Sequence, residues 1–183
     1  MRSFINAPGA APHAAATNNS RWRRWLLLSL AIIVIDIVTK RAILATFLPG
    51  EELPLLPFFS LVLTFNPGAA FSFLADASGW QRWFLAGVAL VTSGIIVWLL
   101  RKGGSTTYCA ALTLILGGAL GNLIDRLTIG KVVDFLLFHW QGWSYPAFNV
   151  ADSAITIGAV LLITDAFRGR RVTPESEATV KER

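Results

Sequence analysis

Hydrophobic and polar positions divide the chain into four long apolar segments joined by more polar connections. The segments cover residues 26–47, 83–100, 108–124 and 148–167. Each is close to the length of roughly 20 residues that an α-helix needs to cross the hydrocarbon core of a bilayer. The pattern therefore predicts an all-α integral membrane protein with four transmembrane helices.

Two of the connections have a pattern of their own. Prolines rule out a continuous helix through residues 48–80. Within that connection, the apolar runs 58–65 and 69–74 flank an Asn-Pro-Gly sequence, which predicts two short strands around a turn. The connection 126–147 ends with two tryptophans, a tyrosine and a proline, and we interpret it as an interfacial loop. The expected fold thus includes a small extracytoplasmic β element beside the helices.

The two ends of the chain differ from its apolar body. Residues 1–20 are small and polar, which predicts a disordered N-terminal extension. The first apolar segment is too long for the h-region of a signal peptide and lacks a convincing small-residue cleavage site, so we expect it to be retained. Residues 21–168 are then one four-helix membrane domain, and residues 169–183 are a disordered cytoplasmic tail.

Composition supports a membrane protein and narrows its chemistry. Of 183 residues, 54% are hydrophobic and 15% are charged. The net charge of +5 does not indicate a nucleic-acid partner, because the basic residues flank apolar segments and form no single patch. The only cysteine, Cys109, excludes an internal disulfide and is expected to be buried and inert. His13 and His139 lie far apart, which gives a histidine metal centre little support.

The basic residues also predict the orientation in the membrane. Eleven lie on the side of the termini: Arg2, Arg21, Arg23, Arg24, Arg101, Lys102, Arg168, Arg170, Arg171, Lys181 and Arg183. Five lie on the opposite side: Lys40, Arg41, Arg82, Arg126 and Lys131. Positive charge favours the cytoplasmic side, so both termini are expected there. Seven polar residues then gather toward the outer face: Asp36, Asn66, Asn122, Asp125, Asp134, Asn149 and Asp152.

Asp134 and Asp152 are the strongest candidates for chemistry. They bracket a loop that leaves and re-enters the same face of the membrane, so their carboxyl groups can meet although they are far apart in sequence. Two carboxyl groups in close contact share a proton, and one then acts as a base while the other acts as an acid. Such a pair can activate a water, direct it at a peptide carbonyl and protonate the departing amine. The residues therefore permit hydrolysis by paired aspartates.

Several of these polar residues also have structural interpretations. Asp36 and Lys40 are four residues apart and can form an intrahelical ion pair. Asp125 and Arg126 can form an ion pair at a helix end that braces the loops. These interpretations stay open beside a role near a catalytic site.

Two further features have structural interpretations. Asn149 can cap the fourth helix, whose first turn then contains Asp152. Gly117 and Gly121 form a small-xxx-small pattern that favours close helix packing. Two functional alternatives to hydrolysis also remain, namely a carboxylate-based proton or ion transporter and a non-catalytic membrane chaperone or binding module.

Five motifs in order resemble those of the bacterial lipoprotein signal peptidases, also called signal peptidase II. They are DIVTK at 36–40, FNPGAAF at 65–71, GNLIDR at 121–126, VVDF at 132–135 and FNVADS at 148–153. The resemblance covers the apolar body of the chain, residues 26–167. It departs from the family at Ile37, where a polar residue, commonly glutamine, is expected.

The resemblance implies an aspartic endopeptidase of the bacterial inner (cytoplasmic) membrane with Asp134 and Asp152 as its catalytic pair. By the same resemblance, the residues that bind substrate or support the site are Asn66, Asn122, Asp125, Arg126, Asn149, Asp36 and Lys40. The implied substrate is a prolipoprotein with diacylglycerol on a cysteine, which is cleaved just before that cysteine.

Further expectations concern the partners and the loop near the site. The family resemblance implies that the protein uses no metal or organic cofactor. It also implies that globomycin inhibits the protein. A monomer holds all the residues of the implied site. The connection 48–80 is expected to lie over the substrate as a mobile cover.

Overall fold

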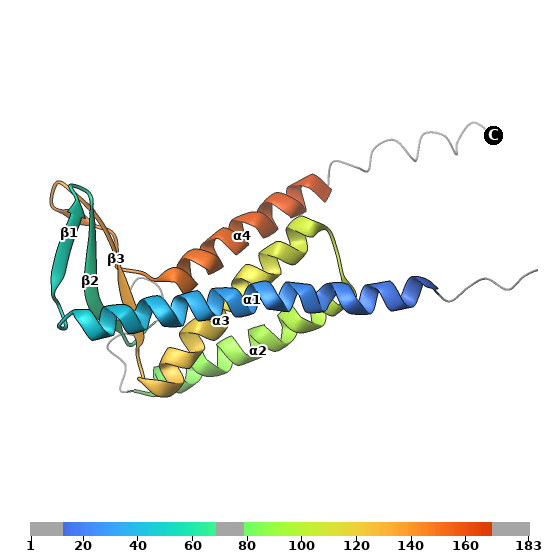
Figure 1. Ribbon diagram of the computed structural model, residues 1–183, viewed down its shortest axis with the longest axis horizontal. Coiled ribbons are helices and arrows are strands. Elements are labelled where there is room, and N and C mark those ends of the chain that lie inside the picture. Colours follow the sequence, from blue (N-terminus) through green and yellow to red (C-terminus); the bar gives the residue numbers. More distant parts are fainter. Residues whose placement is uncertain (1–12, 69–78, 170–183) are drawn as a thin grey trace, which may run out of the picture.

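The computed structural model describes residues 13–68 and 79–169, and it is mostly helical (Figure 1). Its helices are α1 (His13–Thr46), α2 (Trp80–Lys102), α3 (Thr106–Thr128) and α4 (Val150–Gly169). The central helix is α3, which packs against each of the other three. The candidate site is built around one end of this helix.

Three of the described helices, α2, α3 and α4, are long and apolar enough to cross a membrane. The 34-residue helix α1 is also long, but its apolar stretch contains Asp36, Lys40 and Arg41. It lies along α3, where the buried hydroxyl of Ser29 donates a 3.0 Å hydrogen bond to the carbonyl of Thr113. The beginning of α1 and the end of α4 lie at the same end of the bundle (Figure 1).

The start of α1 differs from the sequence prediction. Disorder is predicted through residue 20, whereas the helix begins at His13. The alanines at 14–16 have the highest helix propensity of any residue type, which favours extending the helix in this direction. The remainder of the predicted extension and residues 170–183 of the predicted tail lie outside the described residues.

A small antiparallel sheet lies at the other end of the bundle (Figure 1). Its strands, in spatial order, are β1 (Glu52–Leu56), β2 (Phe59–Asn66), β3 (Val132–Trp140) and β4 (Trp143–Ser144). The sheet confirms the predicted β element. Of the two predicted strands, 58–65 corresponds to β2, and 69–74 lies outside the described residues.

The interpretation of residues 126–147 as an interfacial loop is wrong for most of that segment. After the end of α3, its centre forms β3, which pairs with β2 from Phe59 opposite Phe138 to Asn66 opposite Val132. The strand sequence VVDFLLFHW is rich in β-branched and aromatic residues, which favour strands. Its partner β2 is distant in sequence, so local aromatic composition gave no indication of the pairing.

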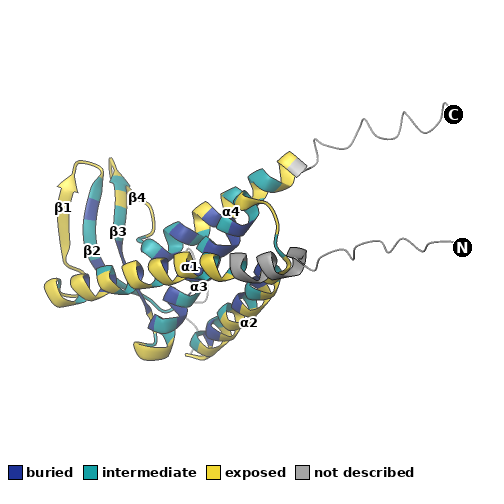
Figure 2. Cartoon of the chain, turned by 45° about the vertical axis from the view of Figure 1, so that its right-hand side comes forward, coloured by how far each residue is buried: buried dark blue, intermediate teal, exposed yellow. Residues whose placement is uncertain are grey.

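Buried residues follow the centre of the bundle and continue into the sheet, whereas the outer faces of the helices are exposed (Figure 2). One apolar cluster joins α2 and α3: Ile96, Leu100, Cys109, Leu112 and Leu116. A second joins the end of α1 to the sheet: Ile43, Leu63, Val133 and Phe135. Cys109 is buried, as predicted. Large exposed apolar side chains such as Leu90 and Val91 are typical of a surface that faces lipid.

Glycines of α3 allow close approach of the neighbouring helices, as predicted for Gly117 and for Gly121, where a Cβ would lie 2.6 Å from Oδ2 of Asp36; Gly118 adds a contact that the predicted pattern does not include. A Cβ atom at Gly117 would lie 2.8 Å from Cβ of Ile32 on α1. At Gly118 it would meet the backbone carbonyl oxygen of Ala151, at the start of α4. Since backbone cannot rotate out of the way as a side chain can, the contact at Gly118 requires glycine.

Replacing Gly118 with alanine is therefore expected to push α4 away from α3 and to destabilise the protein by about 1–3 kcal/mol, the usual range for overpacking. The measurement is the Tm of the purified protein in detergent. Gly87→Ala on α2 is the matched control, because a Cβ there meets nothing within 4 Å. The control should keep the Tm or raise it slightly, and an equal Tm for both variants would contradict the packing argument.

Candidate active site

The polar residues predicted to gather at one face do converge, at the end of the bundle that carries the sheet. Five of them are buried together with Lys40: Asp36, Asn122, Asp125, Asp134 and Asn149. The helices α1 and α3, the strand β3 and the cap of α4 supply these six residues. Buried polar groups of this kind require partners, and the partners here are one another.

Lys40 is the centre of the network. Its ammonium lies 2.7 Å from Oδ2 of Asp36 and 2.8 Å from Oδ2 of Asp125, and it donates a 3.0 Å hydrogen bond to Oδ1 of Asn122. The intrahelical Asp36–Lys40 pair is thus confirmed. The suggested Asp125–Arg126 pair is wrong, because Asp125 faces Lys40, while Arg126 donates to the backbone carbonyls of Asn122 and Gly68.

The two carboxylates paired with Lys40 also hold the backbone next to the candidate catalytic residues. Asp36 accepts a 2.9 Å hydrogen bond from the backbone N–H of Ala151. Asp125 accepts a 3.1 Å hydrogen bond from the backbone N–H of Val133. Each of these N–H groups belongs to the residue immediately before a candidate aspartate. The ion pairs of Lys40 therefore fix the positions of β3 and the start of α4 relative to α1.

Asn149 contacts both candidate aspartates. Its Nδ2 donates a 2.7 Å hydrogen bond to Oδ1 of Asp134. Its Oδ1 accepts a 2.9 Å hydrogen bond from the backbone N–H of Asp152, and its own N–H donates to Oδ2 of Asp152 at 3.3 Å. This reciprocal arrangement is a capping box, so the predicted cap is confirmed. Asn122 completes the set by donating a 2.8 Å hydrogen bond to Oδ1 of Asp152.

The alternation of side chains along β3 aims Asp134 away from the apolar cluster. Val133 and Phe135 pack with the end of α1, whereas Val132 and Asp134 line a cavity on the opposite face. Asp134 itself is 2% exposed. Its carboxyl group is therefore buried at the lining of the cavity, where Asn149 is a hydrogen-bond partner.

The pKa of Asp134 is raised from 3.8 to about 7, mainly by burial and then by the nearby charge of Asp152. Hydrogen bonds from the side chains of Asn66 and Asn149 act in the opposite direction, as does the charge of Lys40. Burial penalises the ionised form of a carboxyl group, and a like charge nearby has the same effect. Asp134 can therefore hold a proton near neutral pH.

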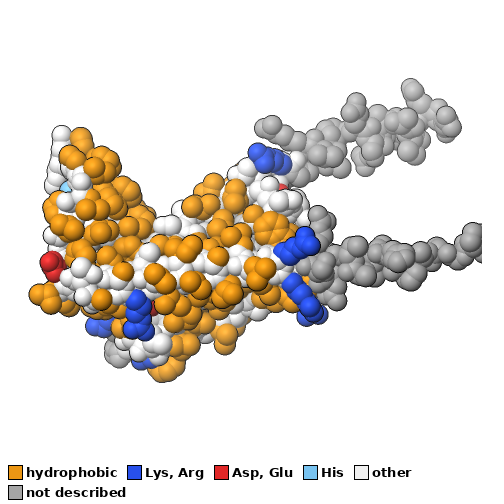
Figure 3. Space-filling model, viewed as in Figure 1, with side chains coloured by type: hydrophobic (Ala, Val, Ile, Leu, Met, Phe, Trp, Pro, Cys, Tyr) orange, Lys and Arg blue, Asp and Glu red, His pale blue; other side chains and the backbone are white. Residues whose placement is uncertain are grey.

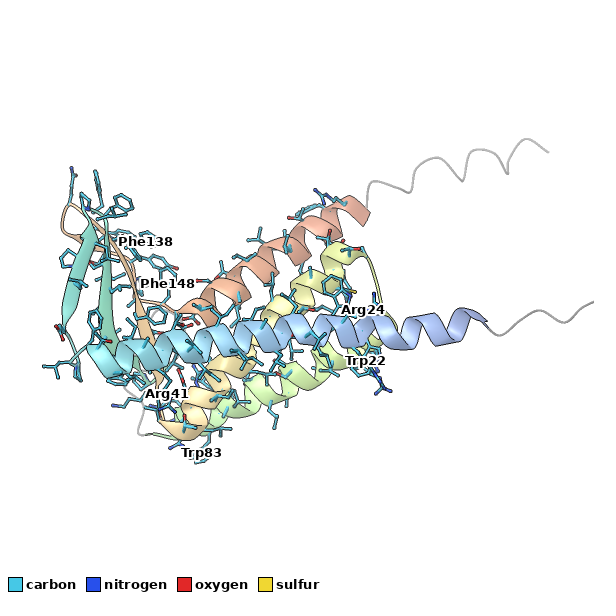
Figure 4. All side chains as sticks on the ribbon, viewed as in Figure 1. Trp22, Arg24, Arg41, Trp83, Phe138 and Phe148 are labelled. Atoms are coloured by element: carbon cyan, nitrogen blue, oxygen red, sulfur yellow. The ribbon has the colours of Figure 1, made fainter. Side chains whose placement is uncertain are left out.

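The cavity has a volume of about 810 Å³. Its floor is α3, its two walls are α2 and α4, and the sheet end is closed by β2, β3 and residues 145–148. Phe148 stacks on Phe138 with ring centroids 5.9 Å apart, which supports this end (Figure 4). The volume falls in the range of sites that bind organic ligands, and most of the lining is apolar.

The predicted site residues divide into two groups around this cavity. Those that line it are Asn66, Asn122, Arg126, Asp134 and Asp152. Those that lie behind it and hold the first group are Asp36, Lys40, Asp125 and Asn149. Sequence reasoning did not find the wall formed by Leu85, Val88, Ala89 and Thr92 of α2. Apolar residues on an apolar helix carry no signal that separates a cavity wall from a lipid-facing surface.

The fold, with apolar helices around a cavity lined by two carboxyl groups, is similar to those of solved bacterial membrane enzymes. The chain superposes with a TM-score of 0.75 and 30% identity on a bacterial membrane enzyme solved by the in meso method at 2.3 Å resolution, covering 84% of this chain and 93% of the other. A second bacterial membrane enzyme, solved at 1.9 Å resolution, gives a TM-score of 0.69 and 31% identity over 78% and 92% of the two chains.

Sequence comparison identifies the family. The model of the Signal peptidase (SPase) II family matches residues 28–168. A lipoprotein signal peptidase of Ralstonia nicotianae is 59% identical over 145 residues, which cover 79% of this chain and 84% of the relative. One of Cupriavidus pinatubonensis is 53% identical over 84% and 88% of the two chains. The chain belongs to the signal peptidase II family, as its motifs suggested.

Proposed function

We propose that this protein is an aspartic endopeptidase that removes the signal peptide from diacylglyceryl-modified prolipoproteins and cleaves just before the lipidated cysteine. The supporting observation is that Asp134 and Asp152 line one cavity and are both hydrogen-bonded to Asn149. Relatives that share more than half of their residues with the chain are lipoprotein signal peptidases. The transporter alternative is not favoured by this family membership.

The proposed reaction uses one proton shared by the two carboxyl groups. The ionised carboxylate removes a proton from a water as its oxygen attacks the scissile carbonyl carbon. The protonated carboxyl group then donates its proton to the nitrogen of the cysteine as the C–N bond breaks. The products are a signal peptide with a new carboxylate and a lipidated cysteine with a free amine. Arg126, Asn66 and Asn122 line the same cavity and bind the peptide backbone around the scissile bond.

In the proposed topology, α1 crosses the bacterial inner membrane together with α2, α3 and α4, which gives four spans. Asp36 and Lys40 are buried and form an ion pair inside the bundle, so α1 presents neither of these charges to lipid. Both termini are cytoplasmic and the sheet end faces outward, since basic residues concentrate at the other end. A diacylglyceryl anchor in the outer leaflet then presents the scissile bond at the depth of the aspartates. The unit acts as a monomer and is inhibited by globomycin.

The proposed cover over the substrate comprises the connection 48–80, of which β1 and β2 form a hairpin at the sheet end. Residues 69–78 of that connection lie outside the described residues. The hairpin borders the cavity through Thr64, Phe65 and Asn66. It is therefore suitably placed to contact a bound prolipoprotein.

Cleavage by the purified chain tests the proposal. In detergent, without any ion gradient, the protein should cut a synthetic prolipopeptide that carries diacylglycerol on its cysteine, and mass spectrometry should find a product that ends just before that cysteine. The same peptide without the lipid is the matched control and should remain uncut. Failure to cut the lipidated peptide would contradict the proposal and would favour a binding module.

The raised pKa of Asp134 sets the expected pH dependence. The carboxyl pair holds its shared proton below about pH 7 and loses it above, so kcat/KM should fall as the pH rises through about 7. The same shift affects stability: between pH 3.8 and about 7 the folded protein retains a proton that the unfolded chain releases, so stability decreases as the pH rises through that range. A pH–rate profile that keeps rising well above pH 7 would contradict this assignment.

A further inference from the structure

The end of the bundle opposite to the sheet carries exposed basic side chains that the proposed reaction does not use. Figure 3 shows Lys and Arg gathered there. We call the following residues the basic cluster: Arg23, Arg24, Arg101, Lys102 and Arg168. They come from the beginning of α1, the last turn of α2 and the last turn of α4.

The charge of the basic cluster is not balanced within residues 13–68 and 79–169. The acidic side chain that these residues supply at this end is Asp165, which accepts a hydrogen bond from the hydroxyl of Ser105. None of the ion pairs in the described part of the chain includes a member of the basic cluster. These exposed cations are therefore available to an anion from outside the described residues.

Two tryptophans contact three of these cations, and one ring joins α1 to α2. The guanidinium groups of Arg23 and Arg101 each lie 5.8 Å from the ring centroid of Trp22. The ammonium of Lys102 lies 3.5 Å from the ring centroid of Trp98. Cation–π contacts hold these side chains in place. The basic cluster therefore presents positioned cations to an anion.

A cavity of about 340 Å³ is lined by Arg24 of the basic cluster and by Trp22, the ring that Arg23 and Arg101 contact. Trp22, Arg24, Trp25 and Leu28 of α1 form one side, and the other side includes Leu100, Gly103 and Gly104. Trp22 and Arg24 lie on the part of α1 near this end (Figure 4). The lining thus combines a guanidinium group with indole and leucine side chains. This combination matches a molecule with an anionic head and an apolar tail.

We propose that this cavity binds an anionic phospholipid from the leaflet at this end of the bundle. Arg24 and Arg101 contact the phosphate, and an acyl chain follows the exposed side chain of Leu28 along α1. Tryptophans and basic residues together are typical of the membrane interface, where the headgroups of anionic lipids lie. The site is separate from the carboxylate cavity and does not depend on the proposed peptidase activity.

The test compares two lipid probes bound to the purified full chain in detergent. Native mass spectrometry should show tighter retention of dioleoyl phosphatidylglycerol than of dioleoyl phosphatidylcholine. The variant Arg24→Gln/Arg101→Gln should lose this preference, since two interfacial cations together change the affinity by roughly tenfold to thirtyfold. Both side chains are exposed, so the variant should keep its fold and Tm. The matched control, Arg41→Gln/Lys131→Gln, removes two exposed cations at the sheet end and should keep the preference.

Three results would overturn the proposal. The first is equal retention of the two lipids by the unchanged protein. The second is a control variant that loses the lipid preference to the same extent as Arg24→Gln/Arg101→Gln, because the preference would then depend on net charge alone. The third is a lipid preference that appears only after residues 172–183 are removed. These residues contain three glutamates, and in the full chain they, rather than a lipid, would then occupy the site.

Discussion

Replacing Asp134 or Asp152 with asparagine is expected to lower kcat/KM for a diacylglyceryl prolipopeptide by roughly a thousandfold, within the range of about 10²–10⁴ for general acid–base catalysis. Asparagine has nearly the same shape as aspartate but cannot gain or lose the shared proton. Because either change removes the same proton-transfer pair, the double variant should lose little more than each single variant.

The fold should survive these two substitutions. An asparagine at 134 can still accept the hydrogen bond from Asn149. One at 152 keeps the 2.8 Å hydrogen bond from Asn122 through its single amide oxygen and gives up the longer one, 3.3 Å, from the backbone N–H of Asn149. The measurement pairs the cleavage rate with the Tm of each purified variant. Asp165→Asn, at the other end of the bundle, is the matched control and should keep full activity. Substantial cleavage by either Asp134→Asn or Asp152→Asn would remove the catalytic assignment.

Lys40→Met is expected to destabilise the protein by about 3–5 kcal/mol, the usual effect of leaving buried charges without their partner. Lys40 is 2% exposed and lies within 2.8 Å of both Asp36 and Asp125. Without the ammonium, these carboxylates repel each other inside the bundle. The measurement is the Tm in detergent, and Arg41→Met, which removes the neighbouring exposed cation, should have little effect.

A rescue variant separates charge from packing. Combining Lys40→Met with Asp36→Asn and Asp125→Asn removes all three buried charges, while amide oxygens remain to accept hydrogen bonds from the N–H groups of Ala151 and Val133. This variant should recover most of the lost stability. If it is no more stable than Lys40→Met alone, the role of Lys40 is packing rather than neutralisation, and the account of the network is wrong.

Local patterns were sufficient for the helices and for the candidate aspartates. The apolar runs predict the four helices, and carboxyl groups within apolar surroundings indicate the candidate aspartates. A spacing of four residues gave the Asp36–Lys40 pair. The spacing from Asn149 to Asp152 gave the helix cap. Each of these features depends on residues that are close together in sequence.

Features that depend on distant residues were missed. The ion pair between Lys40 and Asp125 joins α1 to α3. Nothing in the local sequence shows that Asp125 pairs with Lys40 rather than with its neighbour Arg126. The local sequence predicts an interfacial loop in place of β3, because the pairing of β3 with β2 joins residues more than sixty positions apart. The cavity wall on α2 depends on how that helix is rotated, which packing against α3 decides.

A structure of the protein with a bound peptide analogue tests the central claim most directly. In the analogue, a carbon bearing a hydroxyl group replaces the scissile amide, which mimics the tetrahedral intermediate of hydrolysis. The account predicts that this hydroxyl lies within about 3.2 Å of a carboxyl oxygen of Asp134 and of one of Asp152. A hydroxyl that contacts only one of the two carboxyl groups, or an analogue bound outside the cavity between α2 and α4, would contradict it.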